Sequence, residues 1–367
     1  MADPRFVRRH RRRATAALTS TLLGGAAALA VAPPAGAATI LDNVTAAVRY
    51  ATAAGMSTGI AVLDTRTGRT YSAGNATKRY SGASVVKTLI ATRLLLTGRM
   101  SGPNASLAWR MITRSDNDAA WDLYPTVGGD ALLPWLAAHY RIAGLGARPT
   151  MPGTWGSTQL TAIGVARFYA AVVKDRRVWP WLGSAMHHYA ARSSEGEPNA
   201  WGLAVAAPSV ALKNGWATNR DVLHPSNANI NSTGVVQGDR FAVALLAEGP
   251  PAMYYAKGEA VVSRAAQLLM PGGRLDPPPV VSGLSTHSGN ALGHTPVTIA
   301  GTGFAHVAEV VFGGVRAPSL TVVSSTRIVV TTPPHAAGPV YVQVVSAQGS
   351  SLPDPAGRFT FVSPTNP

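Results

Sequence analysis

The sequence of 367 residues has no cysteine, and only 13% of its residues are charged. The absence of cysteine excludes disulfide bonds, thiolate metal sites, a cysteine nucleophile and a lipid attached to an N-terminal cysteine. Hydrophobic residues make up 46% of the chain, which is too many for a mainly disordered protein. The length is that of two domains. What remains is a globular protein, either secreted or soluble.

The first 37 residues have the pattern of a secretory signal peptide. Arginines crowd the first 13 positions, an apolar stretch follows over 16–31, and small residues end the segment at Ala35-Gly36-Ala37. The apolar stretch is interrupted by glycine and is shorter than the roughly 20 residues of a membrane span. We therefore expect cleavage near Ala37 and a secreted or cell-wall-associated protein, with an uncleaved anchor as the alternative.

Basic residues outnumber acidic ones by 32 to 17 in the whole chain. Beyond residue 37 the counts are 26 and 16, and residues 38–276 hold 23 and 14 of these. Nucleic acid is the usual partner of such a balance, but an exported protein meets anionic cell-wall polymers instead. Because the charges are dispersed, a solvated basic surface explains them equally well. Contact with a cell-wall polymer stays open, and we expect no nucleic-acid partner.

A change of pattern near residue 274 divides the chain. Proline and glycine gather over 270–281, where helical patterns give way to short alternating strands. We therefore predict domains over 38–273 and 274–367. In the first, strands near both ends flank apolar helices, which indicates an α+β domain. Its predicted elements are helices over 40–54, 85–96 and 254–269, and strands over 59–64, 70–73, 211–216, 229–236 and 241–248.

The first chemical motif is Ser84-Val85-Val86-Lys87, which opens an apolar helix. Residues three apart share one face of a helix, so the amine of Lys87 can lie beside the hydroxyl of Ser84. A serine hydroxyl is a weak nucleophile until a base takes its proton, and a partly buried lysine can be neutral enough to do so. Backbone N–H groups at the helix start would stabilise an oxyanion. Alone, this motif occurs by chance about once or twice in such a chain.

Two further motifs follow in order. Ser115-Asp116-Asn117 ends a largely apolar run, and it also suits an ordinary helix N-cap. Lys213-Asn214-Gly215-Trp216 lies in a predicted strand. A lysine there would face a cleft and hold a substrate carboxylate, while Gly215 would let the substrate backbone approach closely.

The order Ser-x-x-Lys, Ser-Asp-Asn, Lys-x-Gly resembles the penicillin-recognising serine enzymes, and the flanking residues resemble class A β-lactamases most. The resemblance extends over roughly residues 40–270. It implies a β-lactamase/transpeptidase-like fold, with an antiparallel sheet and a helical subdomain. It also implies these roles: Ser84 as nucleophile, Lys87 as its base, Ser115 as proton relay to the leaving nitrogen, Asn117 as ligand of the substrate's side-chain amide, Lys213 and Asn214 as ligands of its carboxylate, and the backbone N–H groups of Ser84 and Trp216 beside Gly215 as the oxyanion hole.

Three departures limit what the resemblance implies. Class A β-lactamases carry a glutamate ahead of a Thr-rich helix start, where it activates the water that releases the acyl group. Residues 155–162 resemble that helix start, yet 131–174 contain no Asp or Glu. Only 30 residues separate Ser84 from Ser115, and Asn214 replaces the usual Thr or Ser. We therefore expect an acyl-enzyme that hydrolyses slowly.

Other candidate groups carry less weight. Glu195 and Glu197 could replace the missing base from another loop, but we interpret them as solvated loop charges. His187 and His188 diverge on a predicted helix and suit no metal site. Glycine-rich stretches such as Gly313-Gly314 are not followed by the helix that a phosphate-binding loop needs. We expect neither a metal nor a cofactor.

The C-terminal segment has its own pattern. Short strands occur at Val297-Thr298-Ile299, Val310-Val311-Phe312 and Phe359-Thr360-Phe361-Val362, with glycines at the turns between them. This pattern predicts an all-β immunoglobulin-like sandwich. Residues 277–363 resemble the IPT/TIG domain, which implies a spacer or an adhesive module.

We therefore predict an exported, monomeric serine hydrolase that acts on β-lactams or on the D-alanyl peptides that they mimic. Two alternatives stay open. One is a DD-peptidase or penicillin-binding protein of peptidoglycan. The other is a catalytically dormant surface protein that binds through its IPT/TIG domain.

Overall fold

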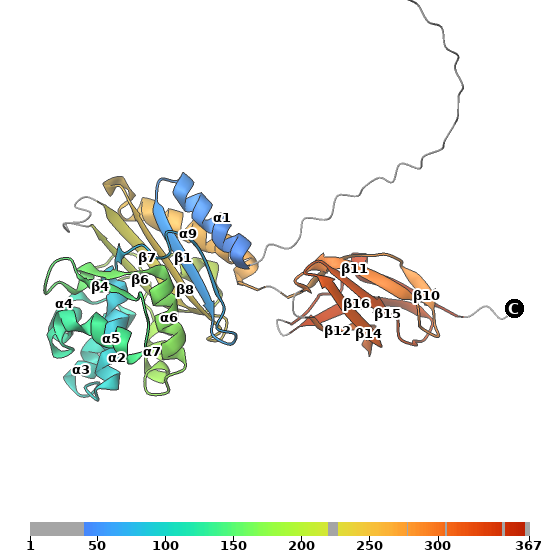
Figure 1. Cartoon of the computed structure of the whole chain (residues 1–367), viewed down its shortest axis with the longest axis horizontal. Helices are drawn as coiled ribbons and strands as arrows, with labels where there is room; N and C mark the ends of the chain where they lie inside the picture. The colour runs from blue at the N-terminus through green and yellow to red at the C-terminus, as the bar shows by residue number, and fades with distance from the viewer. Residues whose placement is uncertain (1–39, 219–226, 277, 305–306, 347–348, 364–367) are drawn as a thin grey trace, which may run out of the picture. The chain divides into compact units, whose positions relative to one another are not determined.

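The computed structural model describes residues 40–218, 227–276, 278–304, 307–346 and 349–363. The predicted signal peptide, residues 1–37, lies outside these ranges. Within them, every helix is too short or too polar to cross a membrane. Figure 1 shows the two folded parts.

A five-stranded antiparallel sheet in the order β2-β1-β8-β7-β6 forms the centre of the first part. Strand β1, from the start of this part, pairs with β8, from near its end. The predicted α+β fold, in which distant segments complete the sheet, is therefore confirmed. The strands are β1 (Ser57–Asp64), β2 (Thr70–Gly74), β6 (Val210–Thr218), β7 (Ala228–Val236) and β8 (Phe241–Gly249).

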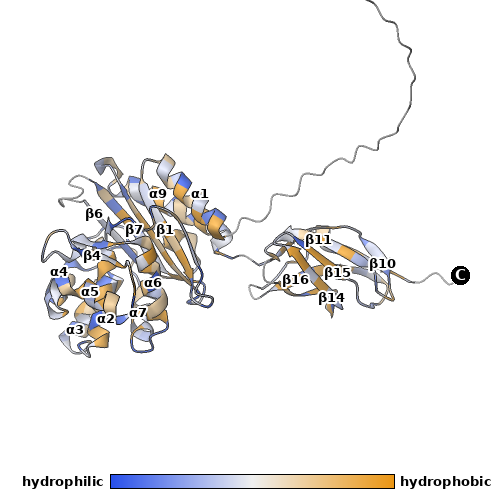
Figure 2. Ribbon diagram, in the orientation of Figure 1, coloured by the Kyte–Doolittle hydropathy of each residue, from blue (hydrophilic) through white to orange (hydrophobic). Residues whose placement is uncertain are grey.

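Helices cover both faces of this sheet (Figure 1). Helices α1 (Ile40–Ala53) and α9 (Ala256–Leu269) pack together on one face, and α6 (Ala162–Val173) packs on the other. In β1, Ile60 belongs to the core under α1 and α9, whereas Ala61 belongs to the core under α6. Strands covered on both faces have long apolar runs, and Figure 2 shows such runs in β1 and β8.

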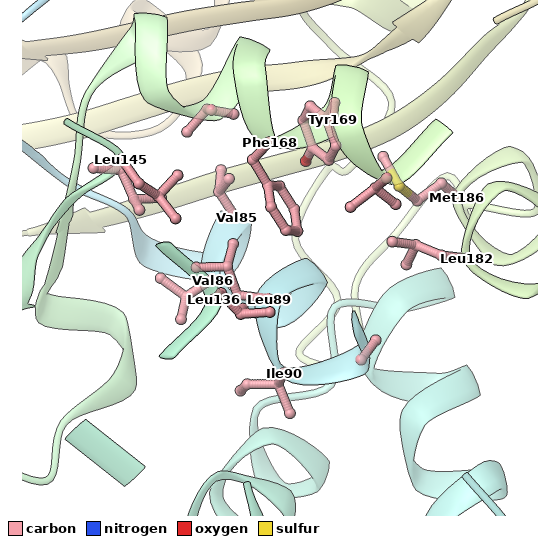
Figure 3. Close-up of a cluster of buried hydrophobic side chains, with 14 of the residues drawn as sticks. Val85, Val86, Leu89, Ile90, Leu136, Leu145, Phe168, Tyr169, Leu182 and Met186 are labelled. Carbon is pink, nitrogen blue, oxygen red and sulfur yellow. The ribbon is translucent and has the colours of Figure 1, made fainter. Parts of the chain in front are cut away.

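A helical region adjoins this sheet, with α2 (Val86–Leu96) at its centre. Figure 3 shows Val85, Val86, Leu89 and Ile90 meeting Phe168 and Tyr169 of α6 and Leu182 and Met186 of α7. Because neighbouring helices cover α2 on most sides, the helix is apolar nearly all round. The remaining helices are α3 (Pro103–Thr113), α4 (Asn117–Thr126), α5 (Leu132–His139), α7 (Trp179–His187) and α8 (Leu203–Ala206).

A small sheet in the order β3-β5-β4 lies beside the helical region, where β4 packs against α5. It comprises β3 (Tyr80–Ser81), β4 (Gly146–Pro149) and β5 (Thr158–Leu160). The segment 155–162, which resembles a helix start in the sequence, contains a 3₁₀ turn and β5 before α6 begins. The hydroxyl of Thr161 accepts a hydrogen bond from the backbone N of Gly164 at 2.9 Å. This N-cap determines where α6 starts.

The second part is all-β, as the sequence predicts. Its sheets have the orders β14-β15-β11-β9 and β10-β18-β16-β12-β13, and β17 pairs with β16. Buried residues of both sheets, among them Ile328, Phe312 and Phe359, share one core. The strands are β9 (Val280–Leu284), β10 (Ser288–Asn290), β11 (Pro296–Thr302), β12 (Val307–Phe312), β13 (Val315–Arg316), β14 (Ser319–Ser324), β15 (Arg327–Thr331), β16 (Gly338–Ser346), β17 (Gly349–Ser350) and β18 (Arg358–Val362).

Candidate active site

The three sequence motifs meet at one cavity of about 280 Å³ in the first part. Ser84 lies in a 3₁₀ turn between β3 and α2, and Ser115 lies between α3 and α4. Trp216 belongs to β6, the last strand in the order of the main sheet. Among the predicted site residues, those that line the cavity are Ser84, Ser115, Asn117 and Trp216.

Lys87 is completely buried on the first turn of α2. Its Nζ donates to the backbone oxygen of Ser115, to Oδ1 of Asn117 at 2.6 Å, and more weakly to Oγ of Ser115 at 3.4 Å. Burial lowers the pKa of Lys87 well below its ordinary range, and the charge of Lys213 lowers it further. A neutral amine has two N–H groups and one lone pair. The two carbonyl oxygens can hold both N–H groups, which leaves the lone pair free to accept a proton.

Ser84 is 7% exposed and lines the cavity. Its Oγ has no hydrogen-bond partner among the residues that the structure describes. Sequence analysis expects the amine of Lys87 beside this hydroxyl, but the hydrogen bonds of that amine run to Ser115 and Asn117. The amine is therefore held by Ser115 and Asn117 and not by Ser84.

The hydroxyl of Ser115 lies between two lysines. Lys213 Nζ donates to Oγ of Ser115 at 2.9 Å and to the backbone oxygen of Asn214 at 3.1 Å. Lys213 is 1% exposed, and burial lowers its pKa to about 7, although the charge of Glu195 opposes this shift. A proton relay needs a hydroxyl that contacts both a base and the cavity, and Ser115 has both contacts.

Three residues that line the cavity have strained backbones, and one of them is Tyr255, with a φ of 56°. Ser115 has a φ of 53°, and Ala83, directly before Ser84, has a φ of 46°. A non-glycine residue in the left-handed region costs on the order of 1–3 kcal/mol and persists only where its surroundings hold it. Such strain is concentrated at functional sites, and here it flanks the hydroxyl groups that the sequence singles out.

The Ser-Asp-Asn motif has two functions in the fold. Asp116 is the N-cap of α4, because its Oδ1 accepts from the backbone N of Ala119 at 3.0 Å. It also pairs with Arg110 at 3.1 Å. The helix-cap interpretation is therefore correct for Asp116, while its neighbours Ser115 and Asn117 line the cavity.

Gly215 lies against the turn that carries Ser84. A Cβ at this position would stand 2.9 Å from the backbone N of Ser84 and 3.0 Å from the carbonyl oxygen of Gly82. Both neighbours are backbone atoms that cannot swing away, so only glycine permits β6 to approach this turn so closely. Sequence analysis attributes the glycine to the approach of a substrate, whereas the structure attributes it to the approach of Ser84.

The predicted role of the Asn214 side chain needs correction. Its Nδ2 donates to the backbone oxygens of Asn199 at 3.0 Å and Trp201 at 3.1 Å, and the side chain is fully buried. Both N–H groups of the amide are therefore used inside the protein. Because adjacent side chains of a strand point to opposite faces, this amide does not meet a substrate carboxylate in the cavity.

Glu195 and Glu197, which the sequence indicates are solvated loop charges, lie on an exposed loop at the cavity, with Glu195 exposed and Glu197 half-buried. Both line the cavity, and Oε1 of Glu195 accepts from the backbone N of Asn117 at 3.2 Å. The loop is brought there by backbone hydrogen bonds, including Ser194 N to the oxygen of Arg114 at 2.8 Å. No local sequence signal reports such a pairing between distant segments.

Aromatic residues complete the cavity walls. The sequence analysis assigns none of them to the site apart from Trp216, because isolated aromatic residues have no positional signature. Trp121 contacts Trp155 edge to face, with ring centroids 5.8 Å apart. The aromatic lining consists of Trp121, Trp155, Trp216, Tyr254 and Tyr255.

Comparison with solved structures identifies the architecture around this cavity. A class A β-lactamase from Mycobacterium abscessus matches with a TM-score of 0.50 and 17% identity, over 63% of this chain and 98% of its own. A class A β-lactamase from Bacteroides cellulosilyticus matches with a TM-score of 0.51 and 14% identity, over 63% and 97%. The first part of the chain has the class A β-lactamase fold. At these identities, the likeness concerns the fold alone.

Two other comparisons add to this result. Residues 279–361 match the IPT/TIG domain family, so the predicted identity of the C-terminal sandwich is confirmed. The "Putative lipoprotein LppW" of Mycobacterium bovis and that of Mycobacterium tuberculosis are each 29% identical to the chain over 261 residues. Each match covers 66% of this chain and 79% of the relative. The chain thus combines a β-lactamase fold with an IPT/TIG domain.

Proposed function

We propose that the β-lactamase-like part is a serine hydrolase that forms an acyl-enzyme on Ser84 with β-lactams or D-alanyl peptides. The observation that carries this proposal is the environment of Lys87, a fully buried amine held by Ser115 and Asn117. An amine desolvated in this way loses its proton easily and can act as a base. The fold of class A β-lactamases supports the same class of reaction.

In the proposed acylation, the proton of Ser84 Oγ passes to Lys87 while Oγ bonds to the substrate carbonyl carbon. The backbone N–H groups of Ser84 and Trp216 stabilise the oxygen that becomes negative. When the C–N bond breaks, the leaving nitrogen takes the proton of the Ser115 hydroxyl, and Ser115 recovers a proton from Lys87 or Lys213. Catalytic hydrogen bonds often shorten only when substrate binds, and we expect the contact between Ser84 and Lys87 to form then.

The second candidate function is that of a DD-peptidase or penicillin-binding protein. The specific observation in its favour is the lack of Asp or Glu over 131–174, the segment that carries the deacylation base in class A β-lactamases. The wall that this segment contributes to the cavity consists of Trp155 and Gly156. Without a base there, a penicilloyl adduct would persist.

We also infer that the protein acts outside the cytoplasm. Residues 1–37 have the pattern of a signal peptide. The mycobacterial relatives are named putative lipoproteins, which agrees with such a location. In this setting the IPT/TIG domain would be a spacer or an adhesive module of a monomeric enzyme, and the basic first domain would contact a cell-wall polymer.

Intact-mass spectrometry during reaction with benzylpenicillin tests the proposal. We expect a mass gain of one whole penicillin molecule, because opening the ring expels no fragment. The gain should be absent in Ser84→Ala and unchanged in Ser184→Ala, which alters an exposed serine of α7. A persistent adduct would support the penicillin-binding protein, and a transient adduct with loss of penicillin would support the hydrolase. If wild type neither gains mass nor consumes penicillin, the proposal is wrong and the dormant binding protein gains support.

A further inference from the structure

The charge of the cavity differs from that of the chain. Lysine and arginine exceed aspartate and glutamate by 32 to 17 overall. Yet among the described residues that line the cavity, the only charged side chains are Glu195 and Glu197. Lys87 and Lys213 lie deeper, at 0% and 1% exposure, and their pKa values are lowered by burial. The wall that a substrate meets is therefore acidic.

The loop that carries these carboxylates is well ordered by hydrogen bonds. Ser193 is buried, and its Oγ accepts from the backbone N of Glu195 and of Glu197, each at 3.2 Å. Oε1 of Glu195 also accepts from the backbone N of Asn117. Within the described part of the chain, neither glutamate forms an ion pair. The backbone of this loop and the carboxylate of Glu195 are thus held in place, and neither carboxylate lies at ion-pair distance from a described lysine or arginine side chain.

A third carboxyl group, outside the cavity lining, lies close enough to Glu197 for its pKa to respond to that charge. Glu259, on the first turn of α9, is 7% exposed, and its buried Oε1 has no hydrogen-bond partner among the described residues. Burial raises its pKa to about 7, and the charge of Glu197 raises it further. Burying an unpartnered carboxyl group near another carboxylate is costly. A cation bound beside Glu197 would relieve that cost.

The aromatic side chains of the cavity lining also favour a bound cation. Faces of tryptophan and tyrosine rings attract cations, and ammonium groups are often recognised by several aromatic rings together. The rings of Tyr254 and Tyr255 have centroids 3.9 Å apart, and both residues line the cavity with Glu197. Trp155 already has Nζ of Lys87 4.7 Å from its ring centroid. Carboxylates and aromatic rings thus share the same walls.

We propose that this cavity binds an ammonium group of the substrate, so that the preferred acyl donor is a peptide with a free amine and not an anionic β-lactam. This inference rests on the proposed function for the position of the reacting serine. The two glutamates would attract the ammonium group and repel the carboxylate of a penicillin. Their removal should therefore weaken the binding of a ligand that has an ammonium group and favour a ligand whose only charge is a carboxylate.

Binding to the Ser84→Ala variant tests the inference without any acylation. The ligands are Nα-acetyl-L-lysyl-D-alanyl-D-alanine and its Nα,Nε-diacetyl form, which differ in one charge. We expect the peptide with the free Nε-ammonium group to bind about tenfold more tightly at low salt. The ratio of the two affinities should fall toward one in the double variant Glu195→Gln/Glu197→Gln, and also in the unmodified site at high salt. The control Asp122→Asn removes an exposed carboxylate of α4 outside the cavity lining and should keep the preference.

Equal affinities of the two peptides, or binding of neither, would overturn the inference. A second readout is the rate of acylation by benzylpenicillin in proteins that keep Ser84. This rate should be higher in the double variant and in each single variant than in wild type. A slower acylation would also overturn it. Failure of the proposed function has a different signature, because it removes every Ser84-dependent adduct but leaves the charge preference of Ser84→Ala measurable.

Discussion

Replacing Lys213 by methionine tests whether burial makes this lysine neutral. Its pKa is lowered from an ordinary 10.5 to about 7, so between these values the unfolded chain binds more protons than the folded chain. The free energy of unfolding therefore rises with pH across this window, and below pH 7 the contribution of Lys213 is constant and least favourable. Since one pH unit corresponds to about 1.4 kcal/mol, Lys213 should add about 2 kcal/mol between pH 7 and pH 9.

Urea unfolding followed by circular dichroism measures this effect in wild type and Lys213→Met. Methionine is an unbranched apolar residue of similar length and suits a site that is 1% exposed. We expect the stability of Lys213→Met relative to wild type to decrease by about 2 kcal/mol from pH 7 to pH 9. A difference that does not change with pH would refute the reasoning, because Lys213 would then have the same protonation in both states.

Three further predictions concern the site and its support. The rate of acylation by benzylpenicillin should not fall as the pH drops through the ordinary lysine range, because Lys87 has a lowered pKa, and Lys87→Met should slow it by about 100-fold or more. A stopped-flow pH profile in which the rate begins to fall as soon as the pH drops below about 10, the ordinary lysine range, would contradict this. Gly215→Ala should slow acylation by about 100-fold by displacing the Ser84 turn, whereas Gly283→Ala, where a Cβ has room and which lies outside the cavity lining, should not; equal rates would contradict the proposed contact. Thr161→Ala should lower the free energy of urea unfolding by about 1 kcal/mol, because α6 loses its N-cap, and an unchanged midpoint would exclude that role.

Local patterns predicted much of the fold and the centre of the site. The predicted strand over 241–248 is β8, over Phe241–Gly249, because an apolar run between turn signals is readable without its partners. The spacing of Ser84 and Lys87 placed both at the start of α2, but the amine of Lys87 contacts Ser115 and Asn117 and not the hydroxyl of Ser84. The prediction failed for Asn214. Side chains alternate between the two faces of a strand, but the sequence does not show which face meets the cavity.

By itself, the sequence determined the order of the motifs, the α+β and all-β parts, and the lack of an acidic residue over 131–174. Only the tertiary structure decided what surrounds the reacting groups. Lys213 contacts Ser115 across 98 positions, and the loop of Glu195 reaches Asn117 across 78. Such contacts depend on packing between segments that are distant in the chain. The same packing excludes water from Lys87 and thereby lowers its pKa, and no motif encodes that property locally.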